Sequence, residues 1–145
     1  MELDHAISSL QSWMAATPQP TPLGMLPATS EVLPIPFGVS LVIGPFNYPI
    51  GNVLSPMISA VAAGNCCVIR PSEMTPNCEK VLYDLIPKYL DTKCIGLVCG
   101  GIETATFVLK QKFDKIFFTG STRVGKIIMT AAAQHLTPVT LELGK

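Results

Sequence analysis

The stretch from residue 115 to residue 126 contains the residues whose types and spacing point most clearly to chemistry. Its sequence is KIFFTGSTRVGK, in which a short apolar run ends at Phe118 and the run from Val124 to Ala133 has the composition of a helix. A strand that turns tightly into a helix directs free backbone N–H groups at one spot, and the helix dipole makes that spot attractive to anions, phosphate above all. This turn therefore predicts a nucleotide-binding unit of the α/β type.

Two phosphate-loop patterns match the turn incompletely. The dinucleotide pattern G-x-G-x-x-G has Thr122 at its middle glycine, where a side chain would hold the backbone away from a pyrophosphate. The pattern G-x-x-x-x-G-K-[ST] of P-loop NTPases matches at both glycines and at the lysine, but the next residue is Ile127, which cannot bind magnesium. The turn alone supports a nucleotide site and a plain helix cap, provided by Ser121 or Thr122, equally well.

Composition narrows the class of protein. The chain has 145 residues, its charged residues make up 14% and balance to zero, and it lacks a long basic run, so we expect no nucleic-acid partner. The five cysteines form neither a C-x-x-C pair nor a zinc-binding spacing, so we expect no metal and mostly buried free thiols in the cytoplasm. The apolar stretch 50–69 is interrupted by proline, glycine and asparagine, which argues against a membrane span.

The elements that must position the turn follow a regular order. Residues 1–16 are predicted to form an N-terminal helix, residues 17–36 a proline-rich extended connection, and residues 37–145 a dinucleotide-binding domain. Within this domain short apolar runs alternate with helix-like segments, which predicts an open, doubly wound, mainly parallel sheet with helices on both faces, a Rossmann-like α/β fold. The predicted strands are 38–43, 66–69, 93–99, 115–118 and 139–141, and the predicted helices are 53–63, 77–90, 103–110 and 122–135.

Four further motifs follow the other strands. They are PFNYP at 45–49, RPSE at 70–73, GG at 100–101 and LELGK at 141–145. Together with FTGSTRVG, and in this order and spacing, they make the region from 36 to 144 resemble the aldehyde dehydrogenases, most of all the class 3 branch, which oxidises fatty and aromatic aldehydes. The resemblance implies oxidation of an aldehyde substrate to a carboxylic acid, with NAD or NADP as the cofactor. In this family the turn binds the dinucleotide less closely than a standard Rossmann loop does, which accounts for Thr122.

The resemblance assigns two catalytic roles. Asn47 corresponds to the asparagine whose amide stabilises an oxyanion, and a neutral donor aimed at developing charge suits that role. Glu142 corresponds to the general base that activates water, a task that suits a carboxylate at a buried strand end. Without the resemblance, Asn47 reads as a turn residue, and Glu142 reads either as an exposed strand-end charge or as a ribose acceptor.

The resemblance also assigns a cofactor-binding set. Arg70 stands where the family usually has a ribose-binding lysine, and because an arginine could also favour a 2′-phosphate, the choice between NAD and NADP stays open. Without the resemblance, the RPSE motif reads as an exposed loop before a capped helix. The implied cofactor-binding residues are Arg70, Ser72, Glu73, Gly100, Gly120, Ser121, Val124 and Gly125.

The chain also departs from the family pattern. The family's nucleophilic cysteine lies downstream of the ELGG segment, whereas this sequence ends LELGK and all five of its cysteines lie upstream. We therefore expect an incomplete family fold, from a fragment, a shortened isoform or a truncated gene product, that lacks turnover by itself. The homo-oligomer typical of the family is not expected to extend to so short a chain. The alternative is a non-catalytic nucleotide-binding or regulatory module with the same fold.

Overall fold

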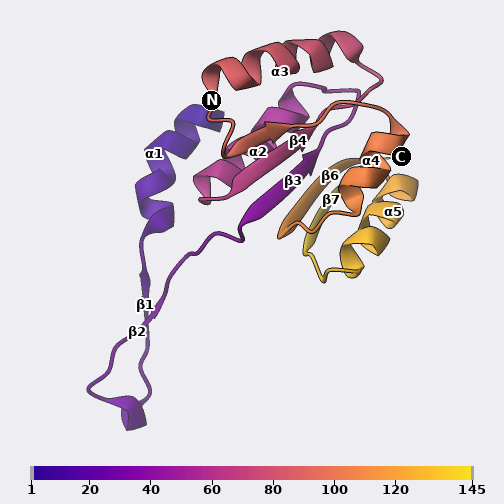
Figure 1. Ribbon diagram of the computed structural model, residues 1–145. Helices are drawn as coiled ribbons and strands as arrows, with labels where there is room; N and C mark the ends of the chain where they lie inside the picture. Colours follow the sequence, from indigo (N-terminus) through magenta and orange to yellow (C-terminus); the bar gives the residue numbers. More distant parts are fainter. Residues whose placement is uncertain (1, 145) are drawn as a thin grey trace.

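A computed structural model describes residues 2–144 and places one parallel sheet between two pairs of helices (Figure 1). The chain opens with helix α1 (Glu2–Met14), continues through a thin two-stranded projection, and then enters the sheet. The five strands of the sheet are β3 (Val39–Ile43), β4 (Cys66–Arg70), β5 (Ile95–Leu97), β6 (Lys115–Ser121) and β7 (Val139–Gly144). The predicted order of strands and helices is confirmed.

The helices cover the two faces of the sheet in pairs. Helices α2 (Gly51–Ala62) and α3 (Pro76–Tyr89) pack on one face, and α4 (Ile102–Leu109) and α5 (Thr122–Ala133) pack on the other. The first face buries a cluster that includes Val42, Val53 and Ile69, and the second buries a cluster that includes Leu41 and Ile128. Burying a side chain of this kind is worth about 1.5–3 kcal/mol, so the two clusters are what hold the layers together.

The strand order is β5-β4-β3-β6-β7, and every neighbouring pair in this sheet is parallel. The chain moves outward from β3 through β4 to β5, then crosses back to β6 on the far side of β3. Right-handed crossovers in opposite directions place the helices on opposite faces, which makes the sheet doubly wound. The predicted fold class is therefore confirmed, and the sheet is parallel throughout.

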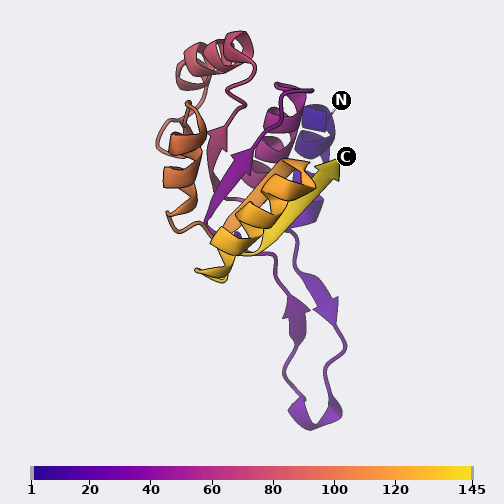
Figure 2. The same ribbon diagram turned by 90° about the vertical axis from the view of Figure 1, so that its right-hand side faces the viewer.

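The proline-rich segment differs from the simple connection that its sequence predicts. Strand β1 (Thr17–Gln19) pairs antiparallel with β2 (Ser30–Val32), and a 3-10 turn, η1 (Leu23–Met25), lies at the tip. The resulting projection extends away from the sheet (Figures 1 and 2), with nearly all of its side chains exposed. The prolines exclude an α-helix, as expected. They do not prevent β1 and β2 from pairing along their edges over three residue pairs.

Within residues 2–144, none of the helices combines the length and the apolar character that a membrane crossing requires. Helix α2 corresponds to the apolar stretch that invites a membrane assignment. It contains Pro56 and has two fully buried residues, Val53 and Met57, which pack on the sheet.

The packing of α5 yields a direct stability test. Ile128 is 2% exposed and belongs to the cluster under α5, whereas its neighbour Met129 is 57% exposed. Replacing Ile128 by alanine leaves a cavity, and we expect the free energy of unfolding to fall by about 2–5 kcal/mol in urea denaturation. The matched control Met129→Ala should change it by less than about 0.5 kcal/mol. Equal losses in both variants would contradict the placement of this helix.

Candidate functional site

The carboxyl ends of the parallel strands open into a cleft of about 780 Å³. This volume lies within the range of small-molecule and cofactor pockets, and the cleft includes the β3–β6 boundary, where doubly wound sheets bind ligands. Most of the predicted residues line it: Asn47, Arg70, Ser72, Glu73, Gly120, Ser121, Val124 and Glu142. The structure thus brings together residues from four strand ends that are far apart in sequence. Two predicted residues, Gly100 and Gly125, do not line the cleft.

The amino end of α5 faces this cleft. The Ser121 hydroxyl accepts a hydrogen bond from the Val124 N–H at 3.4 Å, so Ser121 is the helix cap. The other N–H groups of the first turn have no partner inside the helix, and they and the helix dipole favour an anion. Arg123 adds a positive side chain to the same wall. The cap and the anion site, which the sequence leaves as alternatives, are therefore compatible in one turn.

The two glycines of this turn serve packing. A side chain at Gly125, which is buried on α5, would begin 2.8 Å from a methyl carbon of Leu143. A side chain at Gly120 would begin 2.5 Å from the Phe118 ring. Gly125 therefore allows α5 to approach β7 closely, which is the part of the Rossmann pattern that this turn keeps, and Gly120 leaves room for the Phe118 ring of its own strand.

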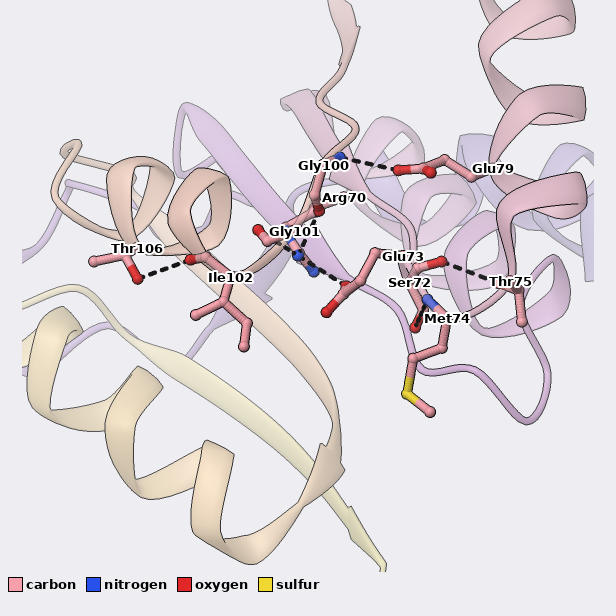
Figure 3. Close-up of polar contacts among 10 residues, drawn as sticks. All are labelled: Arg70, Ser72, Glu73, Met74, Thr75, Glu79, Gly100, Gly101, Ile102 and Thr106. Atoms are coloured by element: carbon pink, nitrogen blue, oxygen red, sulfur yellow. Dashed lines mark hydrogen bonds and ion pairs between the residues drawn. The ribbon is translucent and has the colours of Figure 1, made fainter.

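Arg70 joins two of the loops that border the cleft (Figure 3). It ends β4, is only 5% exposed, and the two N–H groups of its guanidinium Nη2 are shared by three acceptors. The acceptors are a carboxylate oxygen of Glu73 at 2.9 Å and the backbone carbonyls of Gly100 at 2.9 Å and Gly101 at 3.2 Å. The Arg70 Nε is buried and has no hydrogen-bond partner among the described residues. Arg70 is thus a buried clamp between the β4–α3 and β5–α4 loops, in contrast to the exposed loop that its sequence also allows.

Gly100 supports the clamp from behind. Its φ of +134° is in the region that favours glycine, and a side chain there would collide with Thr104. Its N–H donates to a carboxylate oxygen of Glu79 at 3.0 Å (Figure 3). In the described chain Gly100 therefore shapes the loop that Arg70 holds.

Asn47 and Glu142 lie on the other side of the cleft. Both are exposed, Asn47 in the β3–α2 loop and Glu142 on strand β7. The prediction that Glu142 is buried at its strand end is wrong for this chain, because β7 pairs only with β6 and forms the edge of the sheet. A smaller pocket of about 240 Å³ adjoins Glu142 and is lined by Asn52, Ser55, Pro56, Phe117 and Thr119.

The sequence did not indicate several residues of this cleft. Arg123 lies within the phosphate-loop motif, so its charge was a usable signal. Ile102, Ala105 and Thr106 line the wall formed by α4, and no pattern in the sequence could place that helix beside the turn.

The five cysteines lie outside the cleft lining. Burial, and then the neighbouring Cys66, raises the pKa of the Cys67 thiol to about 12, and burial followed by Glu79 raises the pKa of Cys99 to about 11. These two thiols stay protonated at neutral pH and are weak nucleophiles. The prediction that the cysteines are mostly buried is wrong, because Cys94 is exposed and only Cys67 is fully buried. Within residues 2–144, no group of three or more His, Cys, Asp or Glu side chains is arranged to hold a metal ion.

Proteins with similar sequences are found among the aldehyde dehydrogenases. Residues 2–145 match the aldehyde dehydrogenase family. The chain is 52% identical to aldehyde dehydrogenase family 3 member B3 of Mus musculus, covering 99% of this chain and 30% of that protein. It is 48% identical to family 3 member B1 of Homo sapiens, covering 99% and 31%. The chain thus spans about 30% of the length of these curated relatives.

Solved structures show the same fold. The substrate-bound AldH of Staphylococcus aureus superposes with a TM-score of 0.95 at 43% identity, covering 99% of this chain and 31% of that one. An NADP-dependent enzyme of E. coli superposes with a TM-score of 0.84 at 25% identity, covering 99% and 30%. Because the family match extends over residues 2–145, this chain belongs to the aldehyde dehydrogenase family.

Proposed function

We propose that this chain supplies the cofactor-binding part of an NAD(P)-dependent aldehyde dehydrogenase, with residues 37–145 as the dinucleotide-binding domain. The observation that carries the proposal is the cleft at the β3–β6 boundary, where the amino end of α5 and the Arg70–Glu73 pair line one cavity. Family membership adds the reaction class, oxidation of an aldehyde to a carboxylic acid. The E. coli enzyme that shares the fold is NADP dependent, so we propose NADP as well as NAD as a cofactor for this chain.

The chemistry of the cleft fits a dinucleotide. The free N–H groups at the start of α5 and the Arg123 side chain would hold the pyrophosphate, and the half-exposed Glu73 carboxylate would accept hydrogen bonds from a ribose. Arg70 would act chiefly by positioning Glu73, because its Nη2 is already engaged with Glu73 and two carbonyls. When bound, the dinucleotide supplies a hydride acceptor.

Two residues of the opposite wall are proposed for the substrate side. The Asn47 amide would donate to the oxygen that becomes negative when a nucleophile attacks the aldehyde. Glu142 would take a proton from the hydrolytic water, and its exposed position on β7 gives water access to the carboxylate. The thiol nucleophile must come from outside the cleft lining described here. A non-catalytic nucleotide-binding module is the alternative, and it shares the cleft but not these two roles.

Calorimetry on the pure 145-residue chain tests the binding proposal. We expect NAD or NADP to bind with one site per chain, and ATP with magnesium to give no magnesium-dependent binding because Ile127 follows the lysine. The same chain mixed with an aldehyde and NAD should form no NADH, since its cysteines lie outside the cleft lining. If neither dinucleotide binds, the proposal is overturned. NADH formation would show that a cysteine of this chain acts as the nucleophile after all.

Charge reversal on α5 tests where the pyrophosphate lies. Arg123 lines the cleft, and Lys126, on the same helix and equally exposed, does not. Arg123→Glu should weaken dinucleotide binding about tenfold, equivalent to about 1.4 kcal/mol, because a negative side chain replaces a positive one beside the phosphates. Lys126→Glu changes the net charge by the same amount and should leave the dissociation constant within about twofold. A similar loss in both variants would mean that only the overall charge matters.

The Arg70 clamp predicts a stability difference between two ion pairs. Arg70→Met removes the buried donor shared by Glu73 and two backbone carbonyls, and should lower the free energy of unfolding by about 2–3 kcal/mol. Lys80→Met breaks an exposed pair with Asp84, whose side chains are 74% and 52% exposed, and should cost less than about 0.5 kcal/mol. Urea denaturation measures both. If Arg70→Met weakens NAD binding without loss of stability, Arg70 is a direct ligand and not a clamp.

A further inference from the structure

Two cysteines lie side by side at the amino ends of strands β4 and β5, on the opposite side of the sheet from the cleft. Cys67 pairs with Ile95 in the parallel register of β4 and β5, so the preceding residues, Cys66 and Cys94, are cross-strand neighbours. The Cys67 N–H donates to the Cys94 carbonyl at 2.8 Å, which fixes the two backbones at this point. Because side chains alternate along a strand, Cys66 and Cys94 point to the same face.

This arrangement suits a disulfide bond. Neighbouring strands lie about 4.7–4.9 Å apart, within the range of about 4.4–6.8 Å that Cα atoms of disulfides span. Cys94 lies in the turn before β5, directly before the first residue of that strand. A hydrogen bond with the Cys66 thiol raises the pKa of Cys94 most, followed by the charge of Cys66, burial and the charge of Asp91. The positive charge of Lys93 lowers this pKa by a smaller amount. The Cys66 and Cys94 thiols are therefore close enough to influence each other.

Accessibility distinguishes the two thiols. Cys94 is exposed, and Cys66 is half-buried next to it. An oxidant in solution therefore meets Cys94 first and finds a second thiol within reach. Cys67 is fully buried, and neither Cys99 nor Cys78, which is on the separate helix α3, has a comparable arrangement in the described structure.

We propose that Cys66 and Cys94 form a reversible redox pair that a peroxide converts to a disulfide. The Cys94 thiolate attacks a peroxide oxygen, the O–O bond breaks, and the sulfur becomes a sulfenic acid while water leaves. The Cys66 thiolate then attacks that sulfur, the S–S bond forms, and a second water leaves, so two thiols lose two electrons and two protons to one hydrogen peroxide. A thiol reductant such as glutathione reverses the reaction by exchange.

The disulfide would close a ring from residue 66 to residue 94. This ring contains the rest of β4, all of α3 and the loop with Arg70 and Glu73. A cross-link over such a span restrains the unfolded chain, so oxidation should raise the melting temperature by several degrees. The proposal does not depend on the proposed function, because the pair lies at the amino edge of the sheet and the cleft lies at the carboxyl edge.

Mass spectrometry of the reduced, folded chain tests the proposal. After hydrogen peroxide at pH 8.5 and alkylation with iodoacetamide, we expect a loss of about 2 Da before alkylation, three alkylated thiols, and a linked peptide pair whose fragments contain Cys66 and Cys94. Dithiothreitol should restore all five alkylated thiols. Melting measured by circular dichroism before and after oxidation gives the expected rise of several degrees.

Three single variants provide the controls. Cys94→Ser and Cys66→Ser should each abolish the linkage and the rise in melting temperature, whereas Cys78→Ser should retain both. Linkage through any other pair, persistence of the linkage in Cys94→Ser, or conversion of Cys94 to sulfinic acid without a disulfide would each overturn the proposal. Because wild-type chain alone reports which cysteines are joined, the result does not depend on the folding of any variant.

Discussion

The parallel pairing of β3 with β6 is the constraint on which the rest of the structure depends. Its register, from Ser40 opposite Lys115 to Ile43 opposite Phe118, aligns the carboxyl ends of the two central strands. After β3 the chain turns to the face of α2, and after β6 it turns to the face of α5. The two loops therefore diverge, and the space between them is the cleft. A slip of one residue in this register would move the buried face of β6 to the opposite side of the sheet.

The remaining strands extend this arrangement to the walls of the cleft. On one side, β4 ends in Arg70, whose bonds to Glu73 and to the Gly100–Gly101 backbone hold two loops in fixed relation. On the other side, β7 places Glu142 at the rim. The first wall is fixed by the hydrogen bonds of a buried arginine, and the second ends in an exposed edge strand. The wall formed by Arg70 and Glu73 is accordingly better defined by this chain alone than the wall formed by Glu142.

Much of this could be predicted from the sequence, because apolar runs and turn residues are local signals. The helices and strands of the sheet, the cap at Ser121 and the gathering of strand-end motifs followed from such signals and from resemblance. The structure supplied what depends on distant partners: the hairpin within 17–36, the clamp that joins Arg70 to carbonyls about thirty residues away, and the exposure of Glu142 and Cys94. Exposure depends on which strand forms the edge, and residue types do not reveal it.

A dinucleotide bound at the carboxyl edge of this sheet would perturb the amides nearest to it, and amide NMR during titration with NAD detects such changes. We predict shift changes concentrated at Glu73 and at the start of α5, from Ser121 to Val124. Amides at the opposite edge, such as those of Asn65 and Asp114, should stay unchanged. Shifts concentrated at that opposite edge, or spread evenly over the chain, would rule out a dinucleotide site at the carboxyl edge.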